Sequence, residues 1–104
     1  MTSDLSPLTS KDLRRARAQE RAKWQPRIKS LRDRITKSEN RITELEAELE
    51  KLSAVLFNPP PETNFADTNR RLKYVQDQIS AHTEEWERAS VELEGVLQEQ
   101  NPAL

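Results

Sequence analysis

The fold of this chain is decided by residues 24–56, which read WQPRIKSLRDRITKSENRITELEAELEKLSAVL. In steps of four and three, ten positions form one stripe, and nine of them are apolar. The ten are Trp24, Ile28, Leu31, Ile35, Ser38, Ile42, Leu45, Leu49, Leu52 and Leu56. This is the spacing of the a and d positions of a heptad repeat, which is typical of helices that pack side by side. A lone helix cannot bury such a stripe, so the chain needs a second helix.

A second stripe follows, in which eight of ten positions are apolar: Phe65, Thr68, Leu72, Val75, Ile79, His82, Trp86, Ala89, Leu93 and Val96. Between the two stripes stand Pro59, Pro60 and Pro61, which cannot continue a helix. Asn64 is a good helix N-cap, so we expect a helix to begin at Phe65. Two long helices joined by a short loop run antiparallel if they pair within one chain.

The sequence therefore predicts an all-α fold, an antiparallel two-helix coiled-coil hairpin with a basic helical extension at its N-terminus. Pro26 lacks an amide donor and disfavours helical geometry at Gln25, so we expect the chain to be kinked, or the helix to restart, at Pro26. The sequence predicts four parts: a flexible linker at 1–9, a basic helix at 10–25, a hairpin at 26–98 and a tail at 99–104. The hairpin consists of a helix at 27–57, a proline-rich loop at 58–64 and a second helix at 65–98.

Charges beside the stripes predict which residues meet across the hairpin. With Ile28 level with Val96, the flanking g positions pair Arg27 with Glu99, Arg34 with Glu92, Arg41 with Glu85 and Glu48 with Gln78. The three charged pairs are attractive, although each exposed pair contributes at most about 1 kcal/mol. A parallel homodimer through the first stripe leaves the second stripe unexplained. A monomer is therefore favoured, and weak homodimerisation stays open.

The composition narrows the classes of function. The 104 residues include one histidine, His82, one glycine and no cysteine. Thiolate metal sites, nucleophilic catalysis and phosphate-binding glycine loops therefore lack their parts, so we expect no catalytic residue, no metal ligand, no cofactor and no enzymatic activity in this chain. The sequence shows no long apolar run and no signal-peptide pattern, which predicts a cytoplasmic protein without a membrane partner.

The charge distribution is the one functional signal. The net charge is −1, yet residues 11–41 hold twelve Lys and Arg against four acids, and residues 42–104 hold five against thirteen. A cationic helix that no acidic helix neutralises suits the phosphate backbone of a nucleic acid. We expect salt-sensitive contacts without base specificity from Arg14, Arg15, Arg17, Arg21, Lys23 and Arg27, and from a second group of Arg70, Arg71 and Lys73. A solvated helix face, in a spacer or protein-interaction coiled coil, is the alternative.

This arrangement resembles the C-terminal coiled-coil domain of ABC-F ATPases, the Uup-like and YheS-like duplicated ATP-binding proteins. The resemblance spans about residues 10–98. It is carried by the basic lead-in at 11–21, by Pro26, by the ITELEAEL run at 42–49 and by the EEWE run at 84–87 with Leu93 near the end.

The resemblance implies an antiparallel hairpin attached after two ATPase modules of the same protein. Those upstream modules, and not this chain, would bind ATP and Mg²⁺. The hairpin would contribute nucleic-acid contacts: to DNA in Uup-like proteins, or to ribosomal RNA or ribosomal protein in relatives that act in translation at the ribosome.

Overall fold

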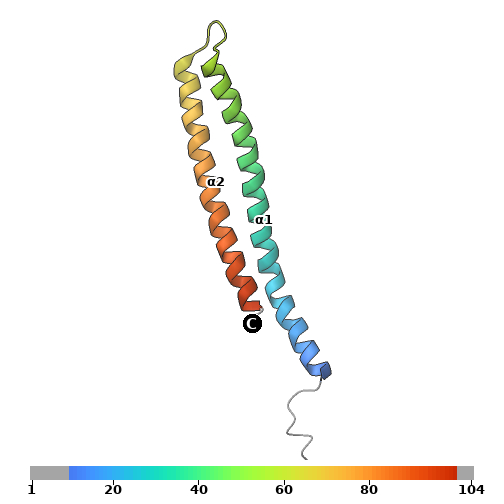
Figure 1. The fold of residues 1–104 in the computed structure, drawn as a ribbon. Coiled ribbons are helices and arrows are strands. Elements are labelled where there is room, and N and C mark those ends of the chain that lie inside the picture. The colour runs from blue at the N-terminus through green and yellow to red at the C-terminus, as the bar shows by residue number, and fades with distance from the viewer. Residues whose placement is uncertain (1–9, 101–104) are drawn as a thin grey trace, which may run out of the picture.

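The computed structural model describes residues 10–100, with side chains described for 10–99, so the predictions for 1–9 and 101–104 lie outside the described residues. It consists of α1 (Ser10–Phe57, 48 residues) and α2 (Phe65–Gln100, 36 residues). Figure 1 shows the two helices side by side and antiparallel, with the loop at one end and α1 extending past α2 at the other. The predicted all-α hairpin is confirmed.

Of the two outcomes expected at Pro26, a kink or a restart of the helix, the restart is wrong, because α1 is one helix from Ser10 to Phe57 with Pro26 inside it. A proline removes one backbone hydrogen bond and crowds the preceding turn. Packing against α2 holds the helix on both sides of this position, since Trp24 before it and Ile28 after it belong to one apolar cluster. Pro26 itself is exposed, which leaves the unpaired carbonyl of the preceding turn open to water.

The predicted stripes form the interface between the helices. All ten stripe positions of α1 are buried or partly buried, and Leu31 and Leu45 are only 2% and 1% exposed. On α2, Val75 and Ala89 are fully buried. Trp86 lies at the edge of the interface, 36% exposed, where its indole N–H donates to a Glu39 carboxylate oxygen at 3.2 Å. The core is thus a single row of side chains along the hairpin.

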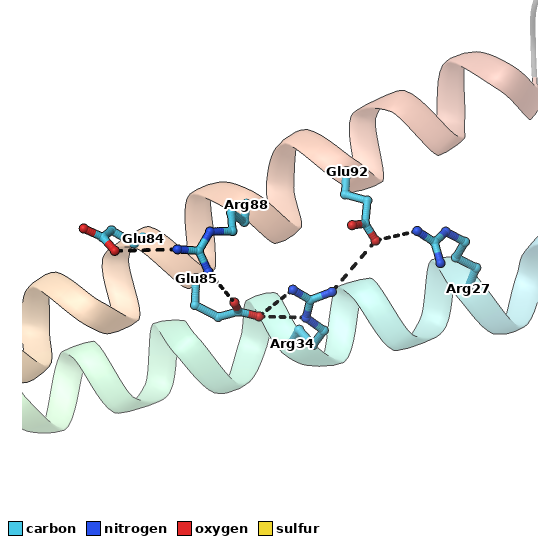
Figure 2. A network of polar contacts seen from close by, with 6 residues as sticks. All are labelled: Arg27, Arg34, Glu84, Glu85, Arg88 and Glu92. Atoms are coloured by element: carbon cyan, nitrogen blue, oxygen red, sulfur yellow. Dashed lines mark hydrogen bonds and ion pairs between the residues drawn. The ribbon is translucent and has the colours of Figure 1, made fainter.

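Ion pairs flank this row, and the shortest contacts of Arg27 and Arg34 are with glutamates one heptad from their predicted partners. Arg27 pairs with Glu92 at 2.7 Å and Arg34 with Glu85 at 2.6 Å, while Arg41 pairs with Glu44 in its own helix. Arg34 also lies 3.8 Å from its predicted partner Glu92, so it bridges two glutamates of α2 (Figure 2). Because g positions recur every seven residues, each arginine lies between two candidate carboxylates.

The start of α2 agrees with the prediction. The Asn64 side chain accepts a hydrogen bond from the Asp67 amide at 3.1 Å, the N-cap contact, and the Asn64 carbonyl accepts from the Thr68 amide at 3.0 Å. Such a cap satisfies a helix amide that has no partner within the helix. The Asn64 cap explains why the helix begins at Phe65.

The loop before this cap contains a strained residue. The Thr63 amide donates to the Pro60 carbonyl at 3.3 Å, closing a four-residue turn with Pro61 second and Glu62 third. Glu62 has a φ of 67°, the sign that the third position of a type II turn requires and that glycine adopts without strain. The loop therefore carries an energetic cost of about 1 kcal/mol at Glu62.

Replacing Leu45 with alanine should lower the free energy of unfolding by about 2–4 kcal/mol, because the side chain is buried between the helices and leaves a cavity. Thermal unfolding followed by circular dichroism should show the midpoint fall by more than about 10 °C. Val91→Ala, at a position that is 69% exposed, is the control and should leave the midpoint nearly unchanged. Equal shifts in the two variants would contradict the interface described.

Glu62→Gly should raise the free energy of unfolding by about 0.5–1 kcal/mol, since glycine accepts positive φ without the steric cost of a Cβ atom. The same thermal assay measures this gain. Glu62→Ala removes the same charge but keeps the Cβ, so it should not stabilise the hairpin. A gain in both variants would assign the effect to charge instead of backbone strain.

Candidate nucleic-acid interface

The N-terminal part of α1 extends beyond the end of α2. Near the open end of the hairpin, Val96 and Leu97 of α2 pack with Trp24 and Ile28 of α1. Every residue of α1 from 10 to 23 is exposed, and Figure 1 shows this end of the helix with no neighbour. We call residues 10–23 the basic extension.

The basic extension has six cations, namely Lys11, Arg14, Arg15, Arg17, Arg21 and Lys23, against the two acids Asp12 and Glu20. At about 1.5 Å per residue it is roughly 20 Å long. Across residues 10–99, no ion pair involves any of these six cations. Five of the nine predicted contact residues therefore lie together with their charges uncompensated.

Arg27 does not belong to this group. Its guanidinium donates to the Glu92 carboxylate at 2.7 Å, and this glutamate joins Arg27 to the network of Arg34, Glu85, Arg88 and Glu84 in Figure 2. The acidic second half of α2 thus neutralises Arg27, as it does Arg34. Lys29, Arg32, Lys37 and Lys51 of α1 also have no ion pair within residues 10–99, but they are spread along the helix, whereas the six cations of the basic extension lie close together in the sequence.

The second predicted group is at the opposite end of the hairpin, near the loop, and its charges are compensated. Arg70 pairs with Asp67 at 2.8 Å and Lys73 with Asp77 at 3.7 Å. Arg71 of α2 donates two hydrogen bonds to Glu48 of α1, and its guanidinium lies 4.9 Å from the centre of the Tyr74 ring. The structure does not bring this group together with the basic extension.

The contact between Arg71 and Glu48 shifts both ionisation equilibria. The pKa of Glu48 is lowered, mainly because Arg71 donates hydrogen bonds to its carboxylate, while partial desolvation opposes the shift. The pKa of Arg71 is raised, mainly by the same hydrogen bonds. This pair therefore joins α1 to α2 near the loop.

Within residues 10–99, no group of three or more His, Asp or Glu side chains is arranged to hold a metal ion. His82 lies partly buried at its predicted stripe position. Neither of the two described helices has the length and apolar character needed to cross a membrane.

Comparison with known proteins identifies no relative, since no family model, no curated protein and no solved structure matches this sequence.

The face of the helix on which the cations lie was missed by the sequence-based prediction. The signal was present, because counting the heptad backwards from Trp24 places Arg21, Arg17 and Arg14 at a, d and a positions. The expected break at Pro26 concealed it. The continuous helix allows the count to be carried through.

Glu48→Gln should lower the unfolding midpoint at pH 7, and its difference from the unaltered protein should shrink as pH falls below the ordinary pKa of a glutamate. A carboxyl whose pKa is lowered by folding contributes stability above its unfolded pKa and loses it as pH falls through the folded pKa. Thermal unfolding at a series of pH values measures the difference. Glu50→Gln, at an exposed position of the same helix, controls for the loss of one carboxylate. A difference that is independent of pH would contradict the role of the pair.

Proposed function

We propose that this chain is a nucleic-acid-binding accessory domain, the C-terminal coiled-coil hairpin of an ABC-F ATPase. In this proposal two ATP-binding modules precede it in the same cytoplasmic protein, and they, with Mg²⁺, hydrolyse ATP. The hairpin contributes salt-sensitive contacts to DNA, or to ribosomal RNA at the ribosome, without reading base sequence. The pattern of the basic lead-in, Pro26, the loop and Trp86 supports the family.

One observation carries the binding function: six cations lie on about 20 Å of exposed helix, and none of them has an ion-pair partner among the residues that the structure describes. Such a concentration of charge repels itself and lowers the stability of the segment unless an anion is bound. The phosphate backbone of a nucleic acid supplies anions at short, regular intervals.

In the rest of the hairpin, many of the charged side chains form ion pairs that join or support the helices. Arg27 and Arg34 of α1 pair with carboxylates of α2, Arg41 pairs with Glu44 of its own helix, and the loop-end group is paired as well. These pairs stabilise the fold. Within residues 10–99, the basic extension is the densest group of cations without ion pairs, because the others, Lys29, Arg32, Lys37 and Lys51, are spread along α1. The predicted contact is therefore short and electrostatic.

Titration of the protein with duplex DNA and with structured RNA tests this function. Binding is expected at low salt and should weaken steeply as salt rises, because each phosphate contact adds about 0.9 to the slope of log K against log salt. Reversing Arg14, Arg15, Arg17 and Arg21 to glutamate should abolish binding. Absence of binding at low salt, or binding unchanged in this variant, would refute the proposal.

The loop end favours a second function, a protein-interaction or spacer coiled coil. Phe57 is 93% exposed and Phe65 50% exposed, on either side of the three exposed prolines. Large exposed apolar side chains clustered on a tip are suited to protein contacts. Sedimentation equilibrium discriminates, since a dimer at micromolar concentration without nucleic-acid affinity would support this second function.

A further inference from the structure

The unbroken course of α1 fixes the direction in which the cations of the basic extension point. The a and d positions that pack against α2 include Ile28 and Trp24. Carried back along the same helix, the next three such positions are Arg21, Arg17 and Arg14. These arginines, here called the arginine stripe, therefore continue the interface stripe on the same face of α1.

This face is uncovered because α2 is the shorter helix. Val96 and Leu97 belong to the same apolar cluster as Trp24 and Ile28, and α2 ends at Gln100, about one turn after them, so its last turn ends near the start of the arginine stripe. Arg17 and Arg14 lie past that end, and all three arginines are exposed. Figure 1 shows the resulting step, at which α2 stops and α1 continues.

The end of α2 also influences what can bind at the step. The final carbonyls of a helix carry partial negative charge, and the last turn of α2 has no basic residue to offset it. An anionic ligand is therefore repelled from the end of α2 and attracted to the arginine stripe beyond it. The step thus sets one boundary of the contact.

The length of the stripe matches a sugar-phosphate strand. Arg14 to Arg21 spans seven residues, or about 10.5 Å along the helix. In a duplex, successive phosphates of one strand advance about 3.4 Å along the axis, and because the strand also winds around that axis they lie further apart than this, so the stripe reaches at most about three of them. An acidic protein helix that packed on the arginine stripe beyond the end of α2 would instead bury several charges in a coiled-coil interface, which costs free energy of desolvation.

We infer that the arginine stripe, and not the whole circumference of the basic extension, contacts one strand of a nucleic-acid backbone at the step where α2 ends. This inference rests on the proposed function and names the face that performs it. Lys11, Arg15 and Lys23 occupy e, b and c positions, outside the seam. They add to the general positive potential and make no close contact.

Two triple variants with the same loss of charge test this inference. One is Arg14→Gln, Arg17→Gln and Arg21→Gln; the matched control is Lys11→Gln, Arg15→Gln and Lys23→Gln. The stripe variant should lose at least about tenfold in affinity for a short DNA duplex at low salt, and the slope of log K against log salt should fall by about 2.7. The control variant should change the slope by less than about 1.

Equal losses in the two triple variants would overturn the stripe while leaving the proposed function intact. Failure of the unaltered protein to bind would overturn both. Tighter binding of a helical peptide of alanine and glutamate than of the duplex, with the same dependence on the stripe, would replace the nucleic acid by an acidic protein helix. Circular dichroism should show equal helix content in the variants, because glutamine is nearly as good a helix former as arginine.

Discussion

The burial of one apolar stripe against another is the interaction on which this protein depends. Neither helix has another neighbour in the described chain, and the core is one row of side chains that includes Leu31, Leu45, Val75 and Ala89. An isolated helix with so much exposed charge would be marginal in water. The packing of the two helices stabilises both of them and offsets the local cost of Pro26 within α1. It also fixes the position along α1 at which α2 ends.

Because α1 is longer than α2, its N-terminal part, the basic extension, has no helix packed against it and forms the candidate binding site. Where α2 is present, its carboxylates Glu92 and Glu85 compensate Arg27 and Arg34 on the flank of α1. Beyond its end the same repeat continues, but arginine replaces the apolar residues of the seam. Structural and binding roles are therefore separated along a single helix.

Much of the fold could be predicted because its signals are local. The two stripes, the three prolines and the Asn64 cap each specify a feature within a few residues, and the helix and loop limits near residues 57 and 65 follow from them. The concentration of cations before Trp24 was equally visible. Their common face was not, because a helix expected to break at Pro26 carries no register across the break.

The sequence by itself determined the two helices, the loop between them and the segregation of charge, since periodicity, proline and helix capping act over a turn or two. The tertiary structure alone decided that α1 passes unbroken through Pro26, since contacts of Trp24 and Ile28 with α2 outweigh a local penalty. It also decided which glutamate each arginine meets. Ion pairs are weak and recur every heptad, so the choice depends on packing along the whole hairpin.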